Sequence, residues 1–460
     1  MTTRTTPAAE PPGAPRPRRA GTSPAGPNPS SPGGPSGPRV PLGRRTWLAI
    51  ITVGFVGQLA WTIENMYLNV FVYNAITTDP TVIATMVACS AAAATLATIV
   101  VGAWSDRLGK RRAFISIGYI VWGLCTAAFG FLGLPDSTVS AAAPVVLTAI
   151  IAVIALDCVM SVFGSGANDA AFNAWVTDST HVTNRGRVEG WLATLPLMSM
   201  LVVFALLDGL TRAGEWTLFF GIIGAVTTLT GIASWFLVRD REVPPTRTTV
   251  WAGIVHWLRP STMRAHPALY LTLLTYAVLS ISVQTFLPYV IIYLQHYLQI
   301  EAYAIALGIT LLLAAVLSVI AGRIMDRVGK TRFLLPAVAV FAMGLVAMFF
   351  ARDLIAVIAS ATVMMGGMMA SLATVAAMTR DHTPAAHAGS IQGVRMILVV
   401  MVPMIIGPFI GAAAITGANN TFTELGVTKS VPGPEIFLAA AAVLLLVPIT
   451  AFLRSRKVRS

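Results

Sequence analysis

The chain has 460 residues, of which 56% are hydrophobic and only 11% carry a charged side chain. Soluble globular domains contain about 25% charged residues, so most of this chain's exterior is not expected to face water. The three cysteines and six histidines show no disulfide pattern and no metal-ligand spacing. Neither a metal nor a cofactor is therefore predicted.

The formal net charge of +12 is unevenly distributed along the chain. Apart from Arg212, Arg352 and Lys429, and from Arg395 about one turn into the eleventh run, the basic residues fall in the N-terminal tail, the loops after even-numbered apolar runs, or the C-terminal tail. This pattern is the positive-inside bias of membrane proteins. It predicts a multi-pass protein of the cell membrane with both termini in the cytoplasm, and it explains the charge without a nucleic-acid partner.

Residues 1–43 are rich in Pro, Gly, Ser and Arg, which predicts a disordered basic tail, and they lack the apolar core of a signal peptide. Twelve apolar runs follow, most of them near the roughly 20 residues that a helix needs to span a bilayer. We expect these helices at residues 47–74, 81–103, 113–133, 145–176, 188–208, 216–238, 268–296, 302–322, 333–351, 354–378, 391–415 and 435–453.

A polar segment at 239–267 divides the twelve runs into two groups of six. Within it, residues 250–258 have the pattern of an amphipathic helix, which we expect at the cytoplasmic membrane surface. The sequence thus predicts an all-α membrane protein with two pseudo-symmetric six-helix bundles, at 44–238 and 268–453. A basic C-terminal tail follows at 454–460.

An internal repeat supports two related halves. Residues 102–112 (GAWSDRLGKRR) recur as 322–332 (GRIMDRVGKTR), each after the second helix of its half. Glycine suits a short turn, and the aspartate can accept bonds from a neighbouring helix end or from arginine. We therefore expect both loops to latch one conformation of the protein. The predicted latch residues are Gly102, Asp106, Arg107, Gly109, Arg112, Gly322, Asp326, Arg327, Gly329 and Arg332.

The repeated loop resembles the signature loop of the major facilitator superfamily. The resemblance implies a transporter that works by alternating access, with its solute bound between the halves. Residues 57–68 (GQLAWTIENMYL) resemble the first helix of the glycoside–pentoside–hexuronide:cation symporters and the related sucrose:proton symporters. Residues 168–175 (NDAAFNAW) resemble their fourth helix, in which the matching aspartate helps to bind sugar and coupling cation.

Two carboxylates are the candidate coupling residues. Glu64 lies at mid-depth in the first helix, and Asp169 lies about 12 Å from the end of the fourth. A charged side chain at this depth costs several kcal/mol, so we expect both residues to face a wet cavity. The alternative is that either one is hydrogen-bonded and stabilises helix packing. For Asp157, about 18 Å further along the fourth helix, we favour this structural role.

The predicted solute-binding residues combine the polar face of the first helix, the matched part of the fourth, and positions in the second half. They are Gln58, Trp61, Asn168, Asp169, Asn173, Gln284, Tyr289 and Arg395. Trp61 either stacks on a sugar ring or packs inside the bundle. Arg395 either binds solute, as the resemblance implies, or snorkels to the headgroups. The methionine-rich run at 364–369 is interpreted as packing filler and not as a copper site.

The same residues favour proton coupling over sodium coupling. Sodium-linked sugar symporters carry an acidic pair on the second helix and a basic residue within the fifth. Residues 81–104 and 191–207 lack them. Proton coupling needs only one carboxylate that can exchange a proton. We therefore predict a proton-coupled symporter for a small polar solute, a sugar or glycoside, that acts as a monomer in the lipid bilayer.

The main alternative is a drug or metabolite:proton antiporter of the same superfamily. Such exporters carry a Gly-x-x-x-Gly-Pro type motif on the fifth helix, whereas the similar GPFIG segment here lies at 407–411 on the eleventh. An intramembrane enzyme is disfavoured because the sequence has none of the usual hydrolase or protease motifs. A sensor or scaffold is disfavoured because no soluble domain is appended.

Overall fold

The computed structural model describes Thr2 and residues 42–133, 144–240, 250–383, 388–424 and 427–459. The predicted disordered tail lies almost entirely outside these residues, as does part of the linker. Residues Val40–Ser460 form one compact unit. Among its described residues, twelve helices are long and apolar enough to cross a membrane, which confirms the predicted all-α fold with twelve spans.

The first six spans are continuous α-helices or α-helices interrupted by a π-helical segment (η). They are built from α1 (Arg44–Thr62), η1 (Ile63–Tyr67) and α2 (Leu68–Ala75); α3 (Pro80–Leu108); α4 (Arg112–Phe129); α5 (Pro144–Gly164), η2 (Ser165–Phe172) and α6 (Asn173–Ser179); α7 (Val182–Val202), η3 (Val203–Leu207) and α8 (Asp208–Arg212); and α9 (Trp216–Leu237).

The linker contributes two short helices, α10 (Val250–Trp257) and α11 (Pro260–Ala265). The remaining spans follow the same plan, with η4 a short 3₁₀ turn. They are built from α12 (Pro267–Phe286), η4 (Leu287–Tyr289), α13 (Val290–Ile292) and η5 (Tyr293–Tyr297); α14 (Tyr303–Val328); α15 (Lys330–Phe350); α16 (Leu354–His382); α17 (Ala388–Arg395), η7 (Met396–Met401) and α18 (Val402–Ala418); and α19 (Glu435–Leu444) with α20 (Leu446–Arg459).

Within each half, the closest helix pairs approach each other at glycine residues. A Cβ on Gly231 of α9 would lie 2.6 Å from the Ile120 amide nitrogen of α4, and one on Gly344 of α15 would lie 2.3 Å from Met364 Cα of α16. Membrane helices pack through such close backbone approach, because lipid gives apolar side chains no drive to associate. Gly411, in the segment that resembles an exporter motif, similarly abuts the Thr285 carbonyl of α12.

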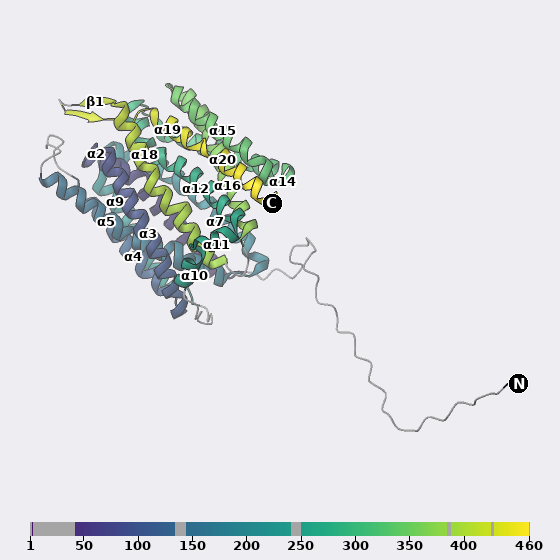
Figure 1. Ribbon diagram of the computed structural model, residues 1–460. Helices are drawn as coiled ribbons and strands as arrows, with labels where there is room; N and C mark the ends of the chain where they lie inside the picture. Colours follow the sequence, from purple (N-terminus) through teal and green to yellow (C-terminus); the bar gives the residue numbers. More distant parts are fainter. Residues whose placement is uncertain are drawn as a thin grey trace. The chain divides into compact units, whose positions relative to one another are not determined.

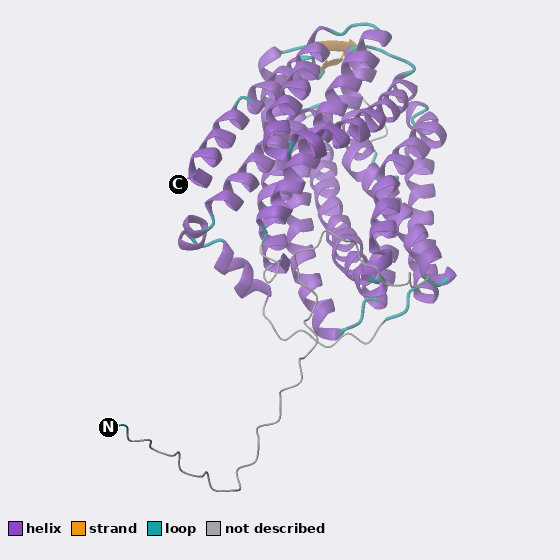
Figure 2. Ribbon diagram, turned by 90° about the vertical axis from the view of Figure 1, so that its right-hand side faces the viewer, coloured by secondary structure: helices purple, strands orange, loops and turns teal. Residues whose placement is uncertain are grey.

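The two halves contact each other along three pairs of spans. Helix α3 packs against α18, α7 with η3 packs against α14, and α2 with η1 packs against α13 and η4. The helices run between the strands β1 (Thr421–Glu424) and β2 (Val427–Ser430) at one end and α10 with α11 at the other (Figures 1 and 2). We call the strand-bearing end, where α2 ends and α3 begins, the loop-1 end.

Hydrogen bonds join the halves at the loop-1 end. The Tyr73 hydroxyl donates to the Ser430 carbonyl at 2.7 Å, and the Arg212 guanidinium donates to the Glu301 carbonyl at 3.1 Å. The His296 ring nitrogen lies 2.8 Å from the Asn74 side-chain oxygen. The loop-1 end is therefore closed by direct contacts between the two halves.

A buried carboxylate anchors this closure. Asp208, at the start of α8, is fully buried and accepts hydrogen bonds from Tyr67 of η1 at 3.0 Å and from Tyr303 of α14. Arg212 pairs with the same carboxylate at 3.0 Å. Because Tyr303 belongs to the second half, Asp208 ties the two halves together. The sequence interpretation did not single out Asp208.

Three local features differ from the sequence expectations. The antiparallel hairpin β1–β2 was not predicted. Helix α20 continues to Arg459, through the segment expected to be a tail. In the linker helix α10, Ile254 and Trp257 are buried against α17 and α12, so part of its apolar face packs against protein.

Candidate functional site

A cavity of about 240 Å³ lies between the first half and the eleventh span. Water occupies about 30 Å³ per molecule in the liquid, so this volume suits a small polar solute. Glu64 and Asp169 both line it, and both therefore face the interior of the bundle. The complete lining is Trp61, Glu64, Asn65, Ser90, Ala91, Ala94, Thr95, Ser165, Asp169, Met396, Val400 and Met404.

Glu64 lies in η1 and is only 8% exposed. One carboxylate oxygen accepts a hydrogen bond from the Ser161 hydroxyl of α5 at 2.6 Å. The other oxygen, Oε2, is buried and has no hydrogen-bond partner among the described residues. Buried polar atoms are almost always paired, so this oxygen requires an explanation beyond helix packing.

Asp169 lies in η2 and is held by its neighbours. The Asn168 side-chain amide donates to Asp169 Oδ1 at 3.1 Å. The Asn168 oxygen lies 2.9 Å from the Tyr119 hydroxyl of α4. This contact needs Gly57 on α1, since a Cβ there would lie 2.4 Å from the Tyr119 hydroxyl. Tyr119 and Asn168 thus orient the Asp169 carboxylate at the cavity wall.

Both carboxylates sit on π-helical segments. A π turn widens the helix and is frequent at functional sites. Here η1 carries Glu64 and η2 carries Asn168 and Asp169, and η7 of the eleventh span carries the lining residues Met396 and Val400. All the polar residues of the lining come from the first half, and the second half contributes only apolar residues.

Trp61 and Arg395 lie at or next to the cavity. The Trp61 ring lines it and makes an edge contact with Trp122 at 5.3 Å, so the residue both packs and faces the interior. Arg395 lies over the Tyr276 ring, with its guanidinium carbon 5.7 Å from the ring centroid. Its neighbour Met396 lines the cavity.

The other predicted solute contacts lie away from the lining of this cavity. Asn173 donates to the Asp169 backbone carbonyl at 3.1 Å. Gln284 packs against Gly407 of α18. The Tyr289 hydroxyl lies 3.1 Å from the Pro80 carbonyl and 2.9 Å from the Pro408 carbonyl, so it links α3 to the second half. Gln58 is half-buried and is not among the lining residues.

The contribution of the eleventh span was not predicted. Met396, Val400 and Met404 recur every fourth residue and present one face to the cavity. Apolar residues at this spacing look the same whether a helix faces lipid or a cavity. No sequence signal separated these three residues from the lipid-facing ones.

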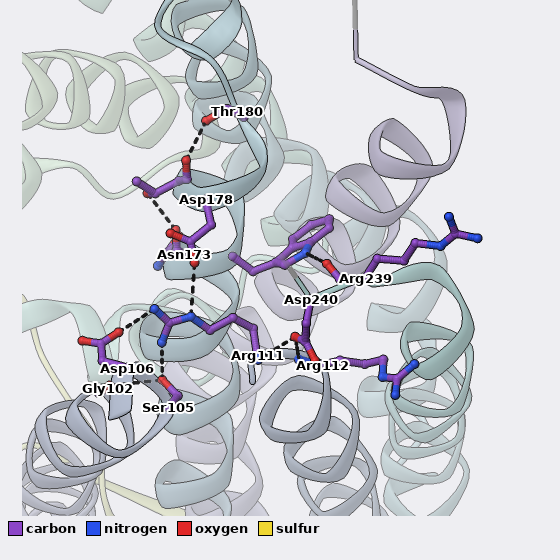
Figure 3. Close-up of polar contacts among 12 residues, drawn as sticks. Gly102, Ser105, Asp106, Arg111, Arg112, Asn173, Asp178, Thr180, Arg239 and Asp240 are labelled. Carbon is purple, nitrogen blue, oxygen red and sulfur yellow. Dashed lines mark hydrogen bonds and ion pairs between the residues drawn. The ribbon is translucent and has the colours of Figure 1, made fainter. Parts of the chain in front are cut away.

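The first repeated loop is held by one arginine (Figure 3). The Arg111 guanidinium pairs with Asp106 at 2.5 Å and with Asp178, at the end of the fourth span, at 3.3 Å. It also donates to the Ser105 hydroxyl at 2.6 Å. The latch was predicted around Arg107 and Arg112, yet Arg107 is exposed and Arg111 occupies the centre. In the run Lys110-Arg111-Arg112, sequence alone did not distinguish these side chains.

The same loop is also tied to the linker. Asp240 Oδ1 accepts from the backbone amides of Arg111 and Arg112 at 2.7 and 2.8 Å, and it thereby caps α4 (Figure 3). The Arg112 side chain stacks over Trp235 of α9, with its guanidinium carbon 4.4 Å from the ring centroid. Trp175 donates to the Arg239 carbonyl at 2.9 Å. The loop therefore joins α3, α4, α6 and the start of the linker.

The comparisons with known proteins agree with this architecture. The family model described as Major Facilitator Superfamily matches residues 50–408, so the chain belongs to this superfamily of membrane transporters. A search of curated protein sequences found no match.

Solved structures are similar over most of their length. A variant of the nucleoside transporter NupG aligns with a TM-score of 0.69 at 12% identity, over 89% of this chain and 99% of that one. A bacterial homolog of the human lysosomal transporter Spinster, inward-facing and unoccupied, gives 0.65 at 17% identity over 89% and 96%. A D-xylose-proton symporter gives 0.62 at 14% identity over 88% and 97%. At these identities the likeness shows the fold alone.

The chain is thus a multi-pass membrane protein and a secondary transporter of the major facilitator superfamily.

Proposed function

We propose that this transporter is a proton-coupled symporter for a sugar or a similar polyhydroxylated solute. The observation that carries the proposal is the pair Glu64 and Asp169 on the walls of one cavity between the halves. The superfamily's fold supports alternating access around such a site.

In this proposal Asp169 binds solute and Glu64 binds the proton. Asp169 is oriented by Asn168 and faces the cavity beside Ser165 and Trp61, which suits hydrogen bonding to sugar hydroxyls. Glu64 is more deeply buried and has an unpaired oxygen. A buried charge without a partner costs several kcal/mol, which a proton on Glu64 removes during the conformational change.

The closed loop-1 end gives the proposal a direction. The basic loops lie at the opposite end, so the positive-inside rule makes the loop-1 end the outer face. With the outer face closed by Asp208 and its partners, we assign the cavity to an occluded or inward-facing state, from which solute leaves toward the cytoplasm. Opening this end requires the Tyr303 and Tyr73 contacts to break.

The sugar assignment has two supports. The D-xylose-proton symporter and the nucleoside transporter NupG, whose names state what they carry, share the fold. Residues 57–68 and 168–175, which resemble the sugar:cation symporters, contribute Trp61, Glu64 and Asp169 to the cavity. The resemblance and the cavity therefore involve the same residues.

Proteoliposomes test this proposal with radiolabelled D-xylose and uridine as probes. An inward proton gradient should drive D-xylose accumulation. Glu64→Gln should abolish gradient-driven accumulation while solute exchange without a gradient persists. Asp169→Asn should lose both activities by about tenfold or more, the equivalent of 1.4 kcal/mol. Glu215→Gln, an exposed carboxylate at the loop-1 end, serves as the matched control.

Three results would overturn parts of the proposal. Undiminished proton coupling in both variants would show that Glu64 and Asp169 do not couple transport to protons. Accumulation driven by a sodium gradient and not by a proton gradient would identify sodium as the coupling ion. Transport of uridine but not of D-xylose would identify nucleosides as the substrate class.

A further inference from the structure

A second cavity lies at the loop-1 end, and we call it the loop-1 pocket. Its volume is about 630 Å³. Small-molecule sites commonly occupy roughly 300–1,000 Å³, so this volume is enough for a solute. The loop-1 pocket shares no lining residue with the cavity that holds Glu64 and Asp169. Arg212, Gln299 and Glu301 line it and are exposed, so a ligand can enter it from solution.

The loop-1 pocket is built from both halves of the protein. Asn74, Arg212 and Trp216 come from the first half, whereas Glu301 and Tyr303 come from the second. The Arg212 guanidinium donates to the Glu301 carbonyl at 3.1 Å, so contacts between the halves form part of the pocket. The complete lining is therefore assembled only while the loop-1 end is closed. A ligand that touches both halves binds the closed state more tightly and thereby stabilises it.

The chemistry of the lining favours a neutral ligand with many hydroxyl groups. Arg212 is already paired with Asp208 at 3.0 Å, and Glu301 adds an exposed carboxylate that would repel an anion. The side-chain amides of Gln295 and Gln299 offer both donors and acceptors.

An aromatic surface completes this lining. The Trp216 ring is held against Phe71 and Phe220, with ring centroids 5.3 and 6.1 Å apart. A fixed aromatic ring beside convergent donors and acceptors suits a sugar-like solute, whose C–H face packs on the ring while its hydroxyls meet the amides.

We propose that the loop-1 pocket is a second binding site for a neutral polyhydroxylated solute, and that solute bound there holds the loop-1 end closed. This inference rests on the proposed function for the class of solute and for the assignment of the loop-1 end to the outer face. External solute then has two effects. It is carried when the loop-1 end is open, and it slows reopening when that end is closed.

Tryptophan fluorescence separates the two sites, because Trp61 lines the inner cavity and Trp216 lines the loop-1 pocket. The purified full-length protein is titrated with D-xylose. In Asp169→Asn, whose inner site is weakened, a saturable fluorescence change should remain. Adding Trp216→Phe should remove this change, whereas adding Trp61→Phe should leave it.

Gln299→Gly weakens the loop-1 pocket without touching Trp216. Gln299 has φ 51°, which glycine adopts freely, so the backbone should tolerate the substitution. D-xylose should bind the pocket about fivefold more weakly in this variant, as expected for one lost hydrogen bond. Gel filtration checks that each variant is folded, and if Trp216→Phe does not fold, Gln299→Gly provides the readout.

Uptake into right-side-out vesicles tests the closing effect. The wild-type initial rate should rise and then fall as external D-xylose increases, because occupied loop-1 pockets delay reopening. Gln299→Gly should move the fall to a concentration about fivefold higher. Glu215→Gln is the matched control, since this exposed carboxylate precedes Trp216 and does not line the pocket. It should keep the wild-type profile.

The inference is overturned if D-xylose gives no saturable change in Asp169→Asn, if the change persists without Trp216, or if wild-type uptake saturates without a fall. A change with sodium glucuronate and none with D-xylose would overturn the neutral class of ligand. These outcomes are distinguishable from failure of the proposed function. A change that depends on Trp216, without proton-driven uptake of D-xylose, would refute the transport proposal alone. Coupled uptake without such a change would refute the loop-1 site alone.

Discussion

The two copies of the repeated loop make different contacts, although both contain the pattern Gly-x-x-x-Asp-Arg-x-Gly-Lys-x-Arg. In the first copy, Arg111 is 10% exposed and joins Asp106, Asp178 and Ser105. In the second copy the residue at the matching position is Thr331, which is exposed. There the loop is connected to the end of the tenth span by Lys330, which pairs with Asp381 at 2.6 Å.

The difference arises from two positions outside the shared pattern. Ser105 and Arg111 of the first loop correspond to Met325 and Thr331 of the second. Asp326, the counterpart of Asp106, is exposed. The largely buried Arg111 bridges two carboxylates with a geometry that only arginine supplies, whereas an exposed lysine pair contributes little. The shared motif residues determine the turn and its charge. The residues between them determine which loop is tightly bound to the neighbouring helices.

The largest expected effect comes from removing the arginine of the first loop. Arg111→Ala leaves Asp106 and Asp178 without their cation and should destabilise the protein by about 3 kcal/mol. Arg111→Lys should recover part of this loss, because lysine keeps the charge but not the forked geometry. Melting temperature in detergent measures both variants. Thr331→Ala is the matched control in the second loop, and equal effects of Arg111→Ala and Thr331→Ala would contradict the comparison.

At the glycines of the two turns, the larger loss of stability is expected in the second loop and not in the first. Gly109 has φ 61° and ψ 16°, and Gly329 has φ 91° and ψ 139°, a region almost restricted to glycine. We expect Gly329→Ala to cost about 2 kcal/mol and Gly109→Ala about 1 kcal/mol. Thermal unfolding of the two variants gives the comparison. Gly322→Ala, inside α14 with open space around an added Cβ, should instead stabilise by about 0.5 kcal/mol.

The smallest effect is expected at the exposed pair of the second loop. The Lys330 and Asp381 side chains are 35% and 54% exposed. Lys330→Ala should therefore change the free energy of unfolding by about 0.5 kcal/mol, and high salt should reduce even that difference. Unfolding in low and high salt measures it. A loss of stability in Lys330→Ala as large as that in Arg111→Ala would show that the two loops contribute equally to stability.

Much of the candidate site could be predicted, but not its boundaries. Glu64, Asp169 and Trp61 line the cavity as their depth and helix face indicated. Asp208 was missed because it lies at a span end, where an acidic residue is unremarkable in sequence. Arg111 was missed because it is one of three adjacent basic residues. In each case at least one partner lies far away in the chain, Asp178 for Arg111 and Tyr67 and Tyr303 for Asp208, and these contacts depend on how the helices pack.

The sequence by itself determined the twelve spans, their division into two sets of six, and the family. Lipid exposure requires long apolar helices whose backbone groups are hydrogen-bonded within the helix, and such helices are recognisable in the sequence as long apolar runs. Only the tertiary structure decided which acidic residues line one cavity, which apolar helix face lines it with them, and which repeated loop is held by a buried arginine. Those outcomes follow from side-chain geometry between helices, which neither hydropathy nor repeat pattern encodes.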